Sequence, residues 1–433
     1  MKNNIISICL FFFLMLPTVS AKTISVKSPG HHKDIQPNLQ AAIDKAEKGD
    51  WVILPEGEFL FSKSVIIEKF ISVKGAGLKK TILYRSEAIP DSVMRGQKWG
   101  AILIFDIRSD KSSGIIVSGI CFRSKKPSVV RGDGGSRVYS TGVEMNECVD
   151  FLIEHCRFEY FGHAGIYVIH NDTLARGLIR KNEFYYNAGA GSGYGVAVVG
   201  TNDKWVTDPK FGSSNFIFVE DNIFDYHRHS IAADGSALYV FRYNTVLNNV
   251  AASGGHAIDT HEARPGEGRG NIFGTRAVEI YNNKLINTTY TYGGQIKKGV
   301  QTGLSSLEES GIAIRSGEAV VYNNEVQGYR YAVTLSNWFF GGTPQPYPVL
   351  YGIGYLSGKA LGPSHSGTEA PMGDGDVFIW NNKVSPFLED EWNIFPPFYN
   401  DEPGWWKEGR DYHLVPKPGY KPFPYPYPYL SKK

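Results

Sequence analysis

An asparagine-centred repeat constrains the fold of this chain more than any other feature. The pattern apolar-x-x-Asn-x-apolar recurs around Asn182, Asn222, Asn244, Asn283, Asn324 and Asn382, and earlier copies around Ile120 and Cys156 replace the asparagine. Asparagine suits a bend between strands, because its amide bonds nearby backbone and the residue tolerates left-handed dihedral angles. The 22 residues from Asn222 to Asn244 are about the length of one short coil. Such a coil buries its apolar stripe only against the next coil, so the repeat predicts a stack.

A second pattern follows each bend by a dozen or so residues and predicts one further strand per coil, which we name the rim strand. Its copies lie at 142–145, 165–168, 195–198, 230–233, 257–260, 311–314 and 332–335. Alternation predicts that Val and Ile point inward. The outward column is then Glu144, Tyr167, Ala197, Ala232, Asp259, Ala313 and Thr334. A second outward column lies two residues later and contains Asn146, Ile169, Val199, Asp234, His261, Arg315 and Ser336.

The two ends of the chain depart from the repeat. Residues 38–47 carry apolar residues at helical spacing after Pro37, and strand-like runs follow at 51–54, 65–67, 71–73 and 81–84. We expect this helix to plug the open end of the stacked sheets. Residues 416–429 alternate proline with aromatics, which predicts an extended segment. We expect that segment to wrap back and cap the last coil; the alternative is a polyproline segment that binds a partner.

The first residues predict export. Lys2, an apolar run at 5–16 and the small residues 19–21 form a secretory signal, so we expect cleavage after Ala21 and a secreted or periplasmic protein. The apolar run is too short for a comfortable membrane span, and no other long one exists. The near balance of 45 Lys+Arg against 43 Asp+Glu does not indicate a nucleic-acid binder. The three cysteines of the mature chain are an odd, small number that argues against a disulfide framework.

These patterns divide the chain into a signal peptide at 1–21, a β-helix at 22–395 and a C-terminal capping tail at 396–433. At this point the chain resembles the pectin-lyase-like superfamily. The resemblance is carried by the motif QAAIDKA…GDWVILPEG at 40–57, by Gly75-Ala76-Gly77 with Thr81, and by the asparagine bends. It covers roughly residues 35–385 and implies an all-β fold, a single-stranded right-handed parallel β-helix. It says little about activity, because this fold carries lyases, hydrolases, epimerases and adhesins.

In the enzymes that the chain resembles, substrate lies over the strand that corresponds to the rim strand. Counting register puts Asp234, His261 and Arg315 on three successive coils, about 4.8 Å apart, with Asp259 beside His261. Histidine titrates near neutrality and arginine stays charged, so the row suits acid–base work on an anion. The predicted catalytic residues are His261, Asp259, Asp234, Arg315, Arg228 and Tyr167. The predicted substrate-binding residues are His163, Tyr226, Glu144, Trp338 and Tyr292.

Other interpretations of the same residues stay open. Asp234-Gly235 is also a good turn dipeptide. The same count gives His229 and His256 inward parity, which predicts a buried polar–aromatic stack with Tyr194 and Tyr331. That parity also counts against a transition-metal site built on His256, Asp259 and His261. The carboxylates of Asp234, Asp259 and Glu144 are ligand types for Ca²⁺, and no other cofactor is indicated.

Three functions compete. The first is a polysaccharide lyase that cleaves a uronic-acid polymer by β-elimination, which needs a base, an acid and a cation for the substrate carboxylate. The second is a glycoside hydrolase with Asp234 and Asp259 as its two carboxylates, roughly 8 Å apart by strand geometry. The third is a non-catalytic carbohydrate-binding or surface protein, which predicts no cluster of titratable residues on the rim strand. We expect a monomer that acts on an anionic polysaccharide.

Overall fold

A computed structural model describes most of the chain. The described residues are 21–86, 100–107, 114–125, 140–170, 176–188, 192–200, 208–249, 256–261, 274–292, 295–298, 310–329, 331–335, 377–385, 398–400, 408–409 and 412–428. The expected signal segment, apart from Ala21, lies outside them.

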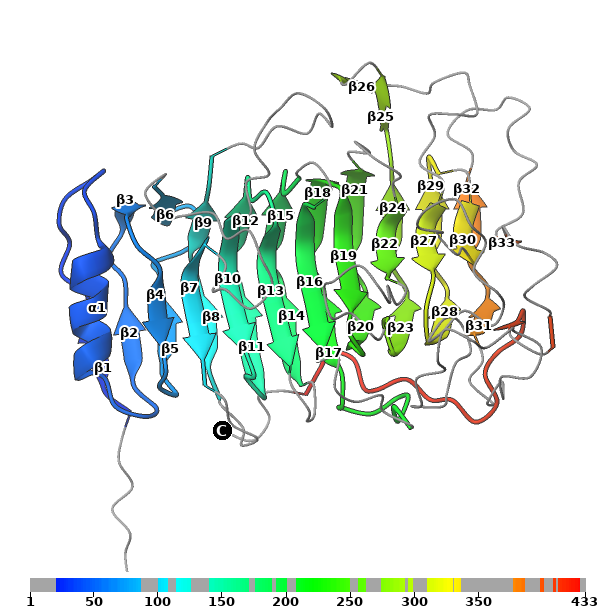
Figure 1. Cartoon of the computed structure of the whole chain (residues 1–433), viewed down its shortest axis with the longest axis horizontal. Helices are drawn as coiled ribbons and strands as arrows, with labels where there is room; N and C mark the ends of the chain where they lie inside the picture. Colours follow the sequence, from blue (N-terminus) through cyan, green and yellow to red (C-terminus); the bar gives the residue numbers. More distant parts are fainter. Residues whose placement is uncertain are drawn as a thin grey trace, which may run out of the picture.

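Three long parallel sheets run the length of the molecule, and the chain passes through them in turn (Figure 1). Sheet A contains, in spatial order, β1 (Thr23–Ser25), β2 (Trp51–Ile53), β5 (Ser72–Lys74), β8 (Ile116–Ser118), β11 (Phe151–Glu154), β14 (Gly177–Arg180), β17 (Ile217–Glu220), β20 (Leu238–Arg242), β23 (Ala277–Tyr281), β28 (Glu318–Tyr322), β31 (Val377–Trp380) and β34 (Tyr412–His413). Sheet B contains β3 (Gly57–Phe61), β6 (Thr81–Arg85), β9 (Cys121–Arg123), β12 (Arg157–Glu159), β15 (Glu183–Tyr185), β18 (Ile223–His227), β21 (Thr245–Asn249), β24 (Lys284–Ile286), β29 (Glu325–Gln327) and β32 (Lys383–Ser385). Sheet C contains β4 (Val65–Ile67), β7 (Gly100–Asp106), β10 (Ser140–Asn146), β13 (Ala164–His170), β16 (Tyr194–Gly200), β19 (His229–Asp234), β22 (His256–Thr260), β27 (Ser310–Ile314), β30 (Tyr331–Leu335) and β33 (Phe398–Asn400). A small antiparallel pair, β25 (Thr289–Tyr292) and β26 (Gln295–Lys298), lies outside the three sheets.

The order A, B, C repeats from coil to coil, so the chain is a single-stranded parallel β-helix, as predicted. Sheet C contains the rim strands of the repeat. The residues of the first outward column pair with one another from coil to coil in the predicted register. Two strands, β33 and β34, lie beyond residue 395 and still pair with β30 and β31.

The predicted asparagines form a continuous ladder at the bend between sheets A and B. The Nδ2 of each donates to Oδ1 of the next, with distances of 3.1, 3.1, 3.2, 2.9 and 2.8 Å from Asn182 to Asn382. Cys156 occupies the same place one coil earlier, where its backbone N–H donates to Asn182. The left-handed residue is the one before each asparagine, such as Asp221 at φ 58° and Tyr243 at φ 55°. The asparagine therefore stabilises the bend by the hydrogen bonds of its side-chain amide and not by adopting the left-handed conformation itself.

Stacked side chains fill the interior between the sheets. Phe122, Phe158, Phe184 and Phe224 form a ladder on sheet B with ring centroids 5.1, 5.2 and 4.6 Å apart. Aliphatic side chains from sheets A and C complete the same core, which runs through the whole stack. Each coil contributes one rung, so the apolar stripe of a coil is buried by its neighbours.

The rim strand does not alternate along its whole length. Ala257 and Ile258 are consecutive, and both belong to the buried core. Likewise, a Cβ placed on Gly165 would meet the core rings of Phe158 and Phe184, although the next residue also points inward. Because two successive residues point inward, the residues that precede them in the strand point to the opposite face from the one that strict alternation predicts. The predicted inward positions of His229 and His256 are therefore wrong, and both lie on the outer face with Asp259.

The ends of the stack differ in part from expectation. The helix α1 (Gln36–Lys45) begins two residues earlier than predicted, has proline in its first turn, and lies at one end of the stack against β1 and β4 (Figure 1). The proline-rich segment 416–428 wraps back along the outer face of sheet A, with Lys417 on Phe378 and Tyr420 on Trp380 of β31, and its later residues reach β20 and β17. We call this segment the strap.

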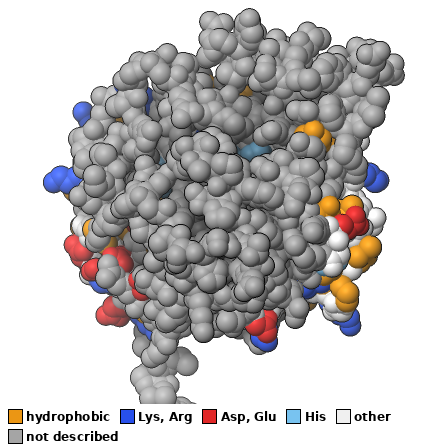
Figure 2. All heavy atoms as spheres, turned by 45° about the vertical axis from the view of Figure 1, so that its right-hand side comes forward, with side chains coloured by type: hydrophobic (Ala, Val, Ile, Leu, Met, Phe, Trp, Pro, Cys, Tyr) orange, Lys and Arg blue, Asp and Glu red, His pale blue; other side chains and the backbone are white. Residues whose placement is uncertain are grey.

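Several general properties of the described residues bear on function. Cys121, Cys148 and Cys156 are buried and free, and burial raises the pKa of the Cys156 thiol to about 12. Among the described residues, no helix is long and apolar enough to cross a membrane. In Figure 2, charged side chains of both signs from the described residues are visible at the margins of the face shown.

Candidate functional site

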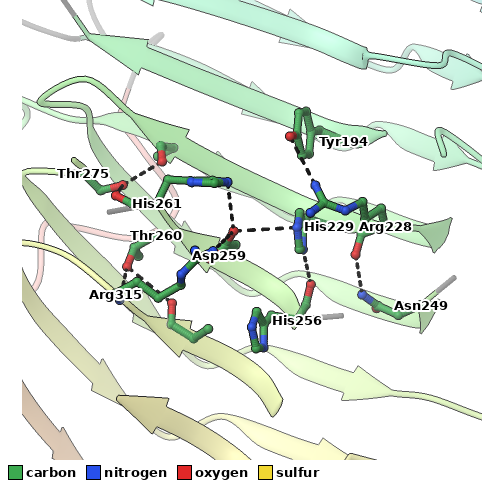
Figure 3. A network of polar contacts seen from close by, with 12 residues as sticks. Tyr194, Arg228, His229, Asn249, His256, Asp259, Thr260, His261, Thr275 and Arg315 are labelled. Atoms are coloured by element: carbon green, nitrogen blue, oxygen red, sulfur yellow. Dashed lines mark hydrogen bonds and ion pairs between the residues drawn. The ribbon is translucent and has the colours of Figure 1, made fainter. Parts of the chain in front are cut away.

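A fully buried carboxylate, Asp259, is the centre of a polar network on the outer face of sheet C (Figure 3). Arg315 Nη1 donates to both carboxylate oxygens at 3.0 Å. The Nε2 atoms of His261 and His229 lie 3.5 and 3.7 Å from Asp259 Oδ2. Asp259 pairs in register with Ala232 and with the alanine of the following coil, and these small neighbours leave room for the longer side chains to converge.

A ladder of rings lies beside this carboxylate. Tyr194 stacks on His229 with centroids 5.8 Å apart, and His229 stacks on His256 at 6.4 Å. The Nδ1 of His229 donates to the backbone oxygen of His256 at 2.5 Å, because a carbonyl can only accept. This bond fixes the tautomer and turns Nε2 toward Asp259. The predicted polar–aromatic stack is thus present, but it forms part of the site and not of the core.

Charge and burial set the protonation of the network. Burial opposes ionisation of Asp259, but the charge of Arg315, followed by His261 and His229, holds its pKa well below the usual 3.8. Burial, reinforced by Arg228, lowers the pKa of His229 to about 3, and burial lowers that of His256 to about 4. The carboxylate is therefore ionised at neutral pH while these two imidazoles are neutral. The side chain of His261 is 13% exposed, whereas those of His229 and Asp259 are 1% and 0% exposed.

Arg228 extends the network toward the preceding turn. Its Nη1 donates to the Tyr194 hydroxyl at 3.3 Å, and Figure 3 shows it beside His229. Its backbone oxygen accepts from Asn249, which anchors the turn. Its Nε is buried and has no hydrogen-bond partner in the described structure. Arg228 is therefore a buried cation with a donor to spare.

A second group of predicted residues lies toward the N-terminal coils. His163 contacts the rings of Tyr167 and Tyr194 at 4.9 and 5.8 Å, and its Nδ1 lies 3.2 Å from Thr141 Oγ1. Glu144, one coil before Tyr167, accepts from the Asn146 amide. Tyr194 is thus the link between these residues and the network around Asp259.

The remaining predicted residues are not gathered at Asp259 by the contacts described here. Asp234 ends β19, and its Oδ1 accepts from the Gly235 N–H at 2.8 Å, which is the turn interpretation. Tyr226 contacts other tyrosine rings on sheet B. Trp338 lies outside the described residues, and only the backbone of Tyr292 is described, in β25.

The predicted calcium ligands do not share a site. Glu144 and Asp259 stand in the same column but are separated by four strand steps, or about 19 Å. One ion cannot contact both carboxylates. Among the described residues, no group of three or more His, Cys, Asp and Glu side chains is arranged to hold a metal ion.

Sequence reasoning missed His229 and Tyr194 as members of the site. Both stand one residue before the small rim position, occupied by Gly195 and Ser230, that points into the core. A small residue recurs at this position in all seven predicted copies of the rim strand, and that was the available signal, since a large side chain there would strike the ring of the core ladder.

Comparisons with known proteins agree with this architecture. The model of the right handed beta helix region family matches residues 107–211. No curated protein matches the sequence. DFA-IIIase from Arthrobacter chlorophenolicus A6, solved without its lid, is 13% identical with a TM-score of 0.50, covering 88% of this chain and 92% of that chain.

Two further solved structures are similar at lower scores. Alginate lyase from Paenibacillus sp. str. FPU-7 is 14% identical with a TM-score of 0.42, covering 91% of this chain and 99% of that chain. ORF18 of Geobacillus virus E2 is 11% identical with a TM-score of 0.48, covering 88% of this chain and 60% of that chain. This chain therefore spans less than two thirds of the length of ORF18. Likenesses at such identities concern the fold alone. Together with the family match, the DFA-IIIase likeness confirms the predicted right-handed parallel β-helix.

Proposed function

We propose that this protein is an exported carbohydrate-active enzyme, a polysaccharide lyase that cleaves a uronic-acid-containing glycan by β-elimination. The observation that supports it is the partly exposed His261 held against the ionised, fully buried Asp259. A buried carboxylate beside an imidazole stabilises the imidazolium that forms when the ring takes a proton. Outward-facing histidine, arginine and tyrosine side chains meet at this place, as acid–base catalysis on an anionic sugar requires.

In this mechanism each group has one task. Neutral His261 takes the C5 proton of the uronate, the C4–C5 double bond forms, and the bond from C4 to the glycosidic oxygen breaks. The positive charge of the Arg228 guanidinium, which also bonds the Tyr194 hydroxyl, stabilises the charge that develops on the substrate carboxylate. The Tyr194 hydroxyl, bonded to Arg228, gives its proton to the leaving oxygen. Arg315 is a positioning residue, since its Nη1 donates to both oxygens of Asp259.

This assignment changes the roles expected from sequence for two residues. Arg315 was predicted to be a catalytic residue that acts on the substrate, but its Nη1 donates to both oxygens of Asp259, so we assign it the task of holding that carboxylate. A hydrolase would need Asp259 as a nucleophile or base, and a carboxylate bonded by arginine with a strongly lowered pKa is a weak base. Both observations favour elimination by histidine over hydrolysis by paired aspartates.

One experiment tests the proposal directly. The mature protein is incubated with a panel of polyuronates and neutral glycans, and absorbance of unsaturated uronyl ends is recorded beside the release of reducing ends. Elimination produces both signals in equal amounts, whereas hydrolysis produces new reducing ends alone. Reducing ends without ultraviolet absorbance on the best substrate would refute the lyase and favour the hydrolase.

A further inference from the structure

Four tyrosines cluster on the outer surface of sheet B, at the end that leads into sheet C. Tyr160, Tyr185, Tyr186 and Tyr226 come from three successive coils, and neighbouring ring centroids lie 5.8–6.2 Å apart. Tyr186 is largely buried, and the other three are half-buried. We call this group the tyrosine platform.

The platform is built on strained backbone. Tyr160, Tyr186 and Tyr226 occupy equivalent places in successive coils and have φ angles of 69°, 53° and 61°. The left-handed region is unfavourable for a bulky residue, and Asn248 occupies the same place in the next coil at φ 53°. The bend itself imposes this conformation, as it does at Asp221 and Tyr243, so these places hold three bulky tyrosines where an asparagine would be accommodated more easily.

The rings of the platform are tilted against one another, so they do not cover one another's faces as the rings of the core do. In the phenylalanine ladder of the core, interplanar angles are 4–15°, so each ring covers the next. In the platform the angles are 36–82°, so the rings meet at edges and tilts. The hydroxyls of Tyr160, Tyr185 and Tyr226 make no hydrogen bond within the described structure. This combination of apolar face and free hydroxyl suits a sugar ring.

The charged neighbours of the platform are already paired. Arg157 lies over the Tyr185 ring at 5.5 Å and pairs with Glu183 at 2.9 Å and Glu159 at 3.3 Å. Arg123 pairs with Glu58 and Glu159, each at 3.0 Å. A ligand carboxylate would have to displace one of these carboxylates. The platform therefore suits the ring faces of a glycan and not its acidic groups.

The platform is continuous with the candidate site along the chain. Tyr226 is two residues before Arg228 and three before His229, so one turn carries both surfaces. The three left-handed tyrosines span two coil steps, about 10 Å along the stack. We propose that the tyrosine platform binds the sugar rings of a glycan chain whose reacting residue lies at Asp259 and His261. This inference rests on the proposed function, because it takes a glycan as the ligand.

Affinity gel electrophoresis tests the platform without requiring turnover. The probes are polygalacturonate, alginate and neutral dextran, each cast in the gel at a series of concentrations. Tyr226→Asn copies the residue of the next coil, and Tyr185→Ala removes the ring that contacts both Tyr160 and Tyr226. The double variant should lose roughly tenfold in affinity for the polymer that retards the wild type best. Tyr185→Phe keeps the ring face and should lose much less.

Tyr84→Ala is the matched control, because Tyr84 is also half-buried on the outer face of sheet B but lies two coils before the platform. It should bind as the wild type does. Retardation due to ring contacts should change little between low and high salt, since no charge pair is formed. Unchanged retardation of the double variant, at a melting temperature equal to that of the wild type, would overturn the platform while the proposed function stands.

A catalytic variant separates the two ideas. His261→Asn should lose turnover yet be retarded as the wild type is. If the platform variants lose retardation but the wild type forms no product from any glycan, the platform stands and the lyase fails. If no glycan retards the wild type and none is converted to product, both the platform and the lyase are overturned.

Discussion

At the scale of single residues, the proposed chemistry depends on His261. The variant His261→Asn keeps a polar side chain but cannot take up a proton near neutral pH, so turnover should fall by about 10²–10⁴-fold. Initial rates on the best substrate, from variants with matched melting temperatures, measure this loss. His155→Asn is the control, because the His155 side chain is 57% exposed and lies at the opposite bend. Equal rates for the two variants would remove His261 from the mechanism.

Asp259 carries a buried charge that only its neighbours make tolerable. Asp259→Asn leaves the guanidinium of Arg315 without its counter-charge, so the free energy of unfolding should fall by about 3–5 kcal/mol. The double variant Asp259→Leu with Arg315→Met removes both charges and should recover part of that loss. Urea denaturation of the three proteins compares them. A double variant that is less stable than Asp259→Asn would contradict this account.

At the scale of elements, the asparagine ladder joins one coil to the next. The amide of Asn244 donates to Val219 O at 2.9 Å and to Asn283 Oδ1 at 3.2 Å, and its own oxygen accepts from Asn222. Asn244→Leu leaves these buried partners unsatisfied, so stability should fall by about 1–3 kcal/mol or more. Lys284→Leu, at an exposed position of the same bend, should change stability little. Similar denaturation midpoints for both variants would speak against the ladder as a stabilising element.

A second set of polar side chains lines the bend between sheets B and C, and one member is a histidine. The backbone N–H of Phe161 donates to Asn187 Oδ1, the N–H of Asn187 donates to His227 Nδ1, and that of Asn249 donates to Asn287 Oδ1. Burial lowers the pKa of His227 from 6.5 to about 4. The unfolded chain then binds a proton that the folded chain does not, so stability should fall as pH drops from about 6.5 to about 4.

Replacing this histidine by the residue of its neighbours tests that dependence. His227→Asn supplies the same acceptor and does not titrate, so its loss of stability between those two pH values should be smaller by on the order of a few kcal/mol. Melting temperatures across this pH range, with the exposed His155→Asn as control, provide the measurement. Parallel pH curves for His227→Asn and the wild type would be the contrary result.

At the scale of the whole molecule, the strap ties the C-terminal end of the chain to the middle of the stack. Arg242, fully buried, pairs with Glu220 at 2.6 Å and donates to the backbone oxygens of Phe423 and Pro424 at 2.6 and 2.9 Å. The Tyr420 hydroxyl donates to Glu279 of β23 and the Tyr427 N–H donates to Glu220 of β17, so the strap crosses three neighbouring strands of sheet A. The strap thus supplies two backbone acceptors to the buried guanidinium of Arg242.

Removing the strap should cost stability without abolishing chemistry. A chain that ends at Lys417 removes the two backbone acceptors that the strap gives Arg242 and leaves Glu220 and Tyr281, so the free energy of unfolding should fall by about 3 kcal/mol. Turnover well below the melting temperature should persist, because the strap lies on sheet A and the candidate site on sheet C. A chain ending at Pro428 is the control. Loss of turnover in a folded, truncated chain would show that the strap acts on the site.

The stack of coils was predictable because its cause is local and repeated. An asparagine at each bend and an apolar stripe in each strand carry the same physical requirement in every copy, so Asn222, Asn244 and Asn283 could be aligned without any structure. Aligning Ile231 with Ile258 was enough to predict the first outward column. The structure pairs these two isoleucines in that register.

The composition of the site was decided by tertiary structure. Two successive inward residues, such as Ala257 and Ile258, reverse the parity of the rim strand and turn His229 and His256 outward, which strict alternation could not predict. Arg315 reaches back one coil to Asp259 because alanines leave space there, so its partner depends on neighbours in space. By itself the sequence determined the fold and the face on which the polar residues gather. Burial and side-chain reach across coils decided which of them meet.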